Sequence, residues 1–136
     1  MRSPAELTDE ELVECGRRSA QTPDKASDLH VIARGGGMGA ILSARQIAAR
    51  RTVAMKVLPG TAARDPQYRR RCLEEAQITS QLEHPNIVPI HDVGIDGEGR
   101  AFYTMKLIKG ITFGRILDHL KAGESDALAR YPLPVL

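Results

Sequence analysis

The first feature that could do chemistry is a run of glycines between two short apolar segments. It consists of Gly35, Gly36, Gly37, Met38 and Gly39. Because glycine has no side chain, such a backbone can lie close to a ligand, and its successive N–H groups can face phosphate oxygens. A flexible hairpin turn that binds nothing has the same residues. Rossmann and Walker motifs are excluded, since their glycines lead from a strand into a helix and these lead from strand to strand.

Lys56 and Glu75 have matching requirements. Lys56 lies within an apolar run and shares a strand face with Ala54 and Leu58, so its ammonium group needs an anion if that face is buried. Glu75 falls on the apolar stripe of a helix, where a carboxylate needs a cation or a proton. Each group could satisfy the other. A lysine that faces water and an unpaired carboxylate at the margin of the stripe fit the spacing equally well.

Three short strands and one long helix are expected to position these groups. Apolar alternation predicts strands over 29–32, 40–44 and 52–58. The glycine run joins the first two strands as a hairpin. Asp65 as N-cap and Pro66 at the first helical position predict a helix of about five turns, which ends at the turn that begins with His84.

Two further strands and two short helices complete the expected elements. The strands cover 87–93 and 100–107. One short helix begins at Thr8, whose spacing to Glu11 is that of a capping box, and the other covers 112–121, with a weaker helical stretch over 124–131. This order predicts an α+β fold, in which a five-stranded antiparallel sheet has one covering helix and short helices at both ends.

The composition excludes several classes of protein. Hydrophobic residues make up 42% and charged residues 26% of the 136 residues, which is ordinary for one globular domain and excludes a disordered chain. A net charge of +2 and an aromatic content of 4% without tryptophan argue against nucleic acid as a partner. No stretch has the apolar length that crosses a bilayer. We therefore expect a cytoplasmic location and no membrane contact from this segment.

Cysteines and histidines give no metal or disulfide pattern. Cys15 and Cys72 form no C-x-x-C pair, and the four histidines lack ligand spacing, so neither a disulfide framework nor a metal site is expected. Cys72, on the apolar side of the long helix, is expected to be a small core residue.

Four motifs, in this order and spacing, resemble the N-terminal lobe of a bacterial Hanks-type (eukaryotic-like) serine/threonine protein kinase. They are the glycine run with its flanks, Val53–Lys56, Leu73–Ala76 and Leu82–Val88. The resemblance extends over 29–136. The glycine run departs from the family's G-x-G-x-x-G by one residue, because aligning Gly39 as the last glycine places Arg34 at the first position.

The resemblance implies a role for each matching residue. Lys56 would hold the α and β phosphates of ATP, and Glu75 would pair with Lys56 to fix its position. Gly35 to Gly39 would form the loop over the phosphates. The adenine would be surrounded by Ile32, Ile41, Ala54, the gatekeeper Met105 and the hinge residues Lys106, Leu107 and Ile108.

The resemblance also divides the chain and limits its activity. It implies an N-terminal helix and linker over 1–28, a kinase N-lobe over 29–109, and the start of a truncated C-lobe over 110–136. Neither H-R-D-x-x-x-x-N nor D-F-G occurs in the sequence, and the family's magnesium ligands and catalytic base belong to these motifs in the C-lobe. The implied function is transfer of the ATP γ-phosphate to protein serine and threonine hydroxyls, with the fragment inactive alone.

Two other functions stay open. One is a nonenzymatic kinase-like module that binds a nucleotide or a partner without transferring phosphate. The other is a plain α+β protein whose glycine loop binds nothing. Stabilisation by ATP and magnesium-dependent phosphorylation distinguish the three.

Overall fold

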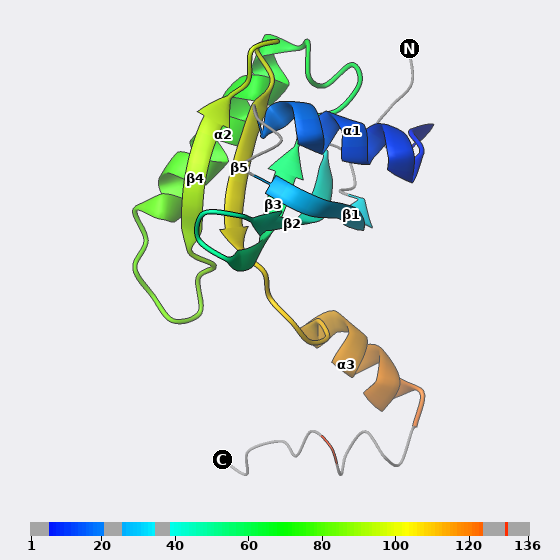
Figure 1. The fold of residues 1–136 in the computed structure, drawn as a ribbon. Helices are drawn as coiled ribbons and strands as arrows, with labels where there is room; N and C mark the ends of the chain where they lie inside the picture. Colours follow the sequence, from blue (N-terminus) through cyan, green and yellow to red (C-terminus); the bar gives the residue numbers. More distant parts are fainter. Residues whose placement is uncertain (1–5, 21–25, 35–38, 124–129, 131–136) are drawn as a thin grey trace.

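A five-stranded antiparallel sheet forms the centre of the chain, as Figure 1 shows for the computed structural model. The structure describes residues 6–20, 26–34, 39–123 and 130. The strands are β1 (Ala26–Arg34), β2 (Ala40–Gln46), β3 (Arg51–Val57), β4 (Ile90–Ile95) and β5 (Ala101–Lys106), in the spatial order β1-β2-β3-β5-β4. The helices are α1 (Asp9–Ser19), α2 (Pro66–Ser80) and α3 (Phe113–Lys121). The predicted α+β fold class is confirmed.

Element ends differ from the sequence prediction most clearly in β1, α2 and β4, and β4 begins at Ile90 and not at residue 87. Strand β1 begins at Ala26 and continues to Arg34, because it pairs with β2 over this whole length and absorbs two irregularities in register. Helix α2 ends at Ser80, several residues before His84. Of the helical stretch expected over 124–131, only Arg130 is among the described residues.

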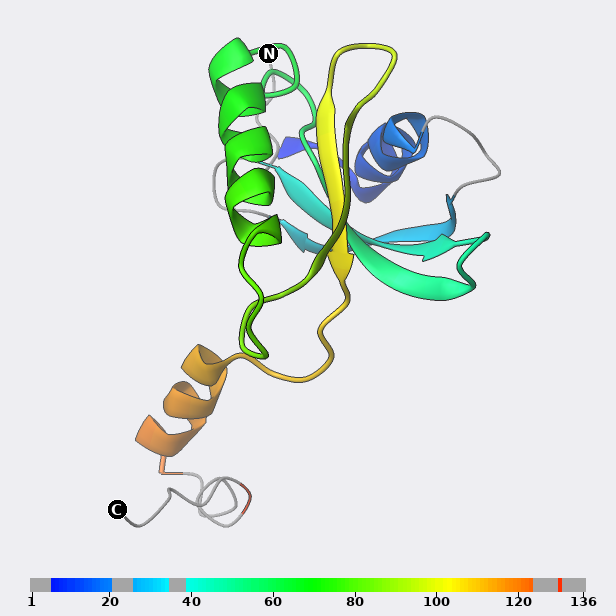
Figure 2. The same cartoon turned by 90° about the vertical axis from the view of Figure 1, so that its left-hand side faces the viewer.

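Helix α2 covers one face of the sheet, over β4 and β5 (Figure 2). Its start is as predicted: the Asp65 side chain accepts a hydrogen bond from the Gln67 N–H at 2.8 Å, and Pro66 follows it. Cys72 and Ala76 are buried against the sheet. Two small residues at the contact let the helix axis lie close to the strands.

Helix α1 covers the opposite face and belongs to the core. Leu12 and Cys15 are buried among side chains of β2 and β3, such as Leu42 and Met55. The predicted capping box is present, since the Glu11 N–H donates to Thr8 Oγ1 at 3.2 Å and Glu11 Oε2 accepts from the Thr8 N–H at 2.8 Å. Expected from sequence as an appendage, the helix instead buries its apolar side against the strands that carry Lys56.

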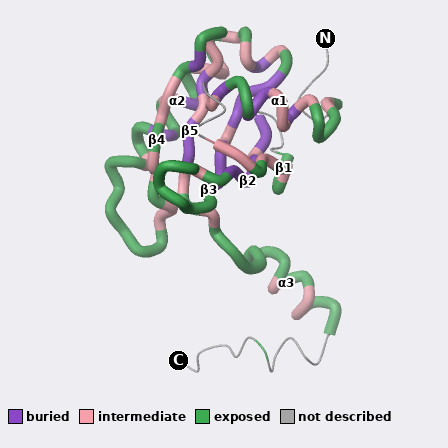
Figure 3. Tube along the Cα trace, viewed as in Figure 1, coloured by how far each residue is buried: buried purple, intermediate pink, exposed green. Residues whose placement is uncertain are grey.

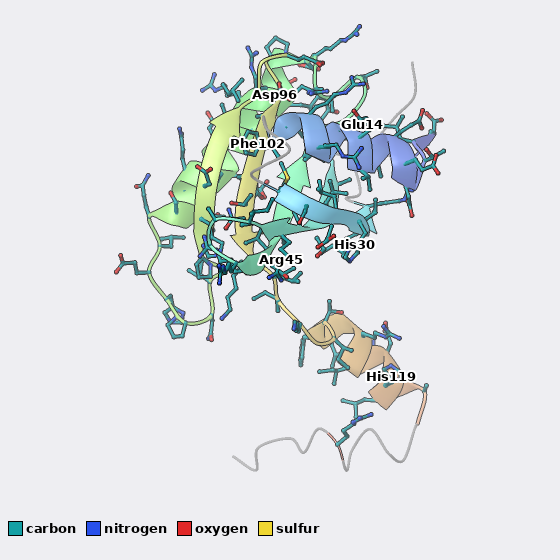
Figure 4. All side chains as sticks on the ribbon, in the orientation of Figure 1. Glu14, His30, Arg45, Asp96, Phe102 and His119 are labelled. Atoms are coloured by element: carbon teal, nitrogen blue, oxygen red, sulfur yellow. The ribbon has the colours of Figure 1, made fainter. Side chains whose placement is uncertain are left out.

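A buried carboxylate joins α1 to the turn between β4 and β5. Asp96, labelled in Figure 4, accepts hydrogen bonds from the Glu98 and Arg100 N–H groups at 2.9 Å and from Arg100 Nε at 2.6 Å. The Ser19 hydroxyl, at the end of α1, donates to the same carboxylate at 3.3 Å. Although burial raises the pKa of Asp96, these donors outweigh that effect and hold the pKa below its ordinary value.

Helix α3 lies apart from the sheet and is largely exposed, as Figures 1 and 3 show. Thr112 is its N-cap and accepts from the Arg115 N–H at 3.2 Å. Phe113 on its first turn is 70% exposed, and Leu117 one turn later is also exposed. None of the described helices is long and apolar enough to span a membrane.

The packing of α1 predicts a destabilising alanine substitution. A Cβ at Gly16 would lie 2.2 Å from Leu42 Cδ1 and 2.9 Å from Leu29 Cδ2, and Leu42 is fully buried and unable to move freely. Gly16→Ala is therefore expected to lower the free energy of unfolding by about 1–3 kcal/mol despite the better helix propensity of alanine. Urea denaturation, monitored by circular dichroism, measures the free energy of unfolding of both proteins.

The matched control is Gly114→Ala in α3. There an added Cβ comes no nearer than 4.0 Å to any other group, so the stability is expected to be unchanged or higher. Equal stability of wild type and Gly16→Ala would contradict the packing of α1 described here.

Candidate functional site

Lys56 lies one residue before the end of β3, on the face covered by α2. Its backbone pairs with Ile41 of β2 and Tyr103 of β5. The alternation of the strand separates it from its neighbours Met55 and Val57, which face α1. With 16% of its side chain exposed, the ammonium group is mostly withdrawn from water and requires a partner.

The partner of Lys56 is Glu75, from the middle of α2. Lys56 Nζ lies 2.9 Å from Oε1 and 3.0 Å from Oε2 of Glu75. The Glu75 side chain is 42% exposed, so the pair sits at the margin of the interface between helix and sheet. The helix and the strand are thereby joined by one charged contact beside the apolar packing of Cys72 and Ala76.

Tyr103 is a third member of this cluster. Its hydroxyl donates to Glu75 Oε1 at 2.5 Å, and the centre of its ring lies 5.6 Å from Lys56 Nζ. The ring face attracts the ammonium group, while the hydroxyl holds one carboxylate oxygen. Tyr103 thus contacts both charges at once.

Sequence reasoning missed the role of Tyr103. Alternation along β5 places it on the face of Met105, but its position opposite Lys56 follows from the pairing of β3 with β5, two strands that are not consecutive in the chain. The role of Tyr103 could have been predicted only by predicting the register between β3 and β5.

The pKa values of the cluster reflect burial and mutual hydrogen bonding. Burial alone raises the pKa of Glu75, but hydrogen bonds from Tyr103 and Lys56 outweigh it and lower the pKa below its ordinary value. The pKa of the Tyr103 hydroxyl is raised, by burial first and then by its bond to the Glu75 carboxylate. Burial raises the pKa of the nearby Cys72 thiol to about 11, so Cys72 is an inert core residue at neutral pH.

The other predicted site residues are distributed along the same sheet. Ala54, which is buried, pairs with Met105 of β5, and Ile41 pairs with Lys56. Ile32 lies at an irregularity in β1 and is 44% exposed, and Ile108 follows β5 and is 60% exposed. Lys106 ends β5, Leu107 follows it, and the Lys106 N–H donates to the Pro89 carbonyl at 3.0 Å.

The glycine run is only partly described. Gly35, Gly36, Gly37 and Met38 lie outside the described residues. Gly39 is buried, and a Cβ there would lie 2.4 Å from the backbone oxygen of Val57. This close approach of β2 to the end of β3 requires glycine at position 39.

Among the described residues, no group of three or more His, Cys, Asp or Glu side chains is placed to hold a metal ion. The described groups of the site are one ammonium group and the carboxylate that orients it. Such an ammonium group can bind an anion.

Comparison with known proteins identifies relatives among bacterial kinases. The chain is 37% identical over 82 residues to the serine/threonine-protein kinase PknH of Mycobacterium tuberculosis, which is 60% of this chain and 13% of PknH. It is 37% identical over 82 residues to PknE of Mycobacterium bovis, covering 60% of this chain and 14% of PknE. It is 36% identical over 91 residues to PknD of Protochlamydia amoebophila, covering 67% of this chain and 9% of PknD. No family profile matches the chain.

The names of these relatives and the α+β fold of the chain indicate the same class of protein. The chain is similar to the N-terminal lobe of bacterial serine/threonine protein kinases, so the resemblance seen in the sequence is confirmed. The chain spans no more than 14% of the length of these relatives.

The contact between Tyr103 and Glu75 predicts a change in the Glu75 pKa. Tyr103→Phe removes a hydrogen bond to the ionised carboxylate, so the Glu75 pKa is expected to rise. Because the folded-state pKa lies below the unfolded value, the stability that the pair contributes is present at neutral pH and is lost as the pH falls through the folded pKa. The variant is expected to lose this stability at a higher pH. Carbon-detected NMR titration of the glutamate carboxyl groups measures the shift.

Tyr68→Phe is the matched control, since Tyr68 of α2 also packs against the sheet, whereas the tyrosine that donates to Glu75 is Tyr103. Its Glu75 pKa is expected to equal that of the wild type. An unchanged Glu75 pKa in Tyr103→Phe would show that the hydroxyl does not support the ion pair.

Proposed function

We propose that this chain is the ATP-binding lobe of a serine/threonine protein kinase, which transfers the γ-phosphate of ATP to protein hydroxyls. The observation that carries the proposal is the ion pair between Lys56 and Glu75, on the sheet face that also carries Ala54 and Met105. The kinase relatives support the same function.

In this proposal Lys56 holds the α and β phosphates of ATP. An ammonium group has three N–H donors, and the two oxygens of Glu75 lie within 3.0 Å of Lys56 Nζ. No third hydrogen-bond partner of Lys56 occurs among the described residues, so one donor is available to a phosphate oxygen. Glu75 and Tyr103 fix the direction in which that donor points.

The adenine ring would lie on the apolar part of the same face. Ala54 is small and buried, and Met105 stands opposite to it on β5. Ile32 and Ile108 are exposed apolar side chains. A flat apolar ring against these residues would remove their apolar surface from water.

Phosphoryl transfer would need residues beyond those of this site. Magnesium, when bound, neutralises the charge of the β and γ phosphates, and a carboxylate receives the proton of the substrate hydroxyl. The sequence contains neither H-R-D-x-x-x-x-N nor D-F-G, so we assign both tasks to a C-terminal lobe and expect the 136-residue chain to be inactive alone.

ATP binding is tested through thermal unfolding. At an ATP concentration of 100 times the dissociation constant, binding stabilises a folded protein by about 2.7 kcal/mol, and the wild-type melting temperature is expected to rise accordingly. Lys56→Met is expected to lose this rise because it removes the phosphate donor. Lys109→Met, the same substitution at an exposed lysine after β5, is expected to retain it. Scanning calorimetry with and without ATP measures all three proteins.

Equal ATP shifts in wild type and Lys56→Met would refute the role of Lys56. A folded wild type with no shift would favour the plain α+β protein without a ligand.

The alternative is a nonenzymatic kinase-like module that binds the nucleotide or a partner. The two functions differ in whether phosphate is transferred to a protein substrate. Incubation with radiolabelled ATP, magnesium and a generic protein substrate distinguishes the two when it is repeated on the longest natural form of the protein. Label in the substrate indicates a kinase, and an ATP shift without label indicates the module.

A further inference from the structure

A cavity of about 400 Å³ opens on the α1 face of the sheet, away from Lys56. Its wall comes from β2, β3, β4 and β5, the turn between β2 and β3, and residues at the end of α1 and the start of β1. Its volume lies within the range of small-molecule sites.

Small or apolar side chains make up most of the lining. Alanines at four positions of β2, the following turn and the end of α1, among them Ala44 and Ala49, leave the space that larger side chains would fill. Val53 and Phe102 supply apolar surface. A lining of this kind binds the body of an uncharged molecule through dispersion and the hydrophobic effect.

Thr104 supplies an unsatisfied polar group to this cavity. It lies on β5 with 7% of its surface exposed, and it lines the cavity. Its Oγ1 has no hydrogen-bond partner within the described part of the chain. Burying a hydroxyl without a partner is costly, and such groups are rare in folded proteins. A ligand that pairs with it would recover this cost.

The lining also includes the titratable residues Arg51, His91 and Asp92, which together carry little net charge. Burial first and then the Arg51 charge lower the pKa of His91, which favours its neutral form. Arg51 Nε donates to Gln46 Oε1 at 2.8 Å, and Asp92 Oδ1 accepts from the Val93 N–H at 2.9 Å. The hydrogen-bond partners of Arg51 and Asp92 are neutral, but the two residues carry opposite charges, so the lining as a whole offers a charged ligand no net counter-charge.

We propose that this cavity binds a small uncharged aromatic or alicyclic alcohol, whose ring fills the alanine-lined space and whose hydroxyl pairs with Thr104 Oγ1. Alternation separates this site from the candidate ATP site, because Thr104 and Tyr103 face opposite sides of β5. The inference does not rest on the proposed kinase function.

The probes are benzyl alcohol and toluene, which differ by one hydroxyl group. Titration of the 15N-labelled 136-residue chain is expected to shift amide signals near Thr104 with both probes, and benzyl alcohol is expected to bind more tightly. Thr104→Val keeps the shape of the side chain and removes the hydroxyl. It is expected to weaken benzyl alcohol about five-fold, the equivalent of one hydrogen bond, and to leave toluene unchanged or tighter.

Two further variants complete the test. Thr52→Val makes the same substitution on the opposite face of β3 and is expected to change neither affinity. Ala49→Phe places a ring at the cavity wall and is expected to abolish binding of both probes.

The proposal is overturned if neither probe binds the folded chain, if the shifted signals lie on the α2 face, or if Thr104→Val binds benzyl alcohol as tightly as the wild type. Loss of folding in Thr104→Val would also overturn it, since the hydroxyl would then have a structural partner.

Discussion

The carboxylate of Glu75 is the group on which the candidate site depends. It accepts from Lys56 Nζ and from the Tyr103 hydroxyl, and so ties α2 to two neighbouring strands. Apolar packing of small residues would allow the helix to slide or rotate over the sheet, whereas three hydrogen bonds to one carboxylate define its position. Because Glu75 is 42% exposed, the cost of desolvating the pair is limited.

Strand β3 serves the core and the site at once. Val53, Met55 and Val57 pack under α1, while Ala54 and Lys56 face the other side. A strand buried on both faces has little freedom to move. Helix α1 therefore supports the site, because it packs on the opposite face of the strand that carries Lys56.

Local patterns in the sequence predicted the elements well. Alternation indicated five strands, the capping residues Thr8, Asp65 and Thr112 marked three helix starts, and each caps a helix in the structure. Contacts between distant residues could not be predicted in this way. The position of α1 on the sheet depends on the close approach of Gly16 to Leu42. The role of Tyr103 depends on the register of β5 with β3. Both contacts are set by tertiary packing, which local propensity does not predict.

Charge explains why this site would bind a polyphosphate only weakly without further groups. Glu75 compensates the charge of Lys56, so the pair presents an oriented N–H donor rather than a net positive charge. Three phosphates carry several negative charges, which a single compensated lysine cannot balance. In a protein kinase that balance comes from magnesium, so the proposed binding of a nucleotide would require further positive charge beside the Lys56–Glu75 pair.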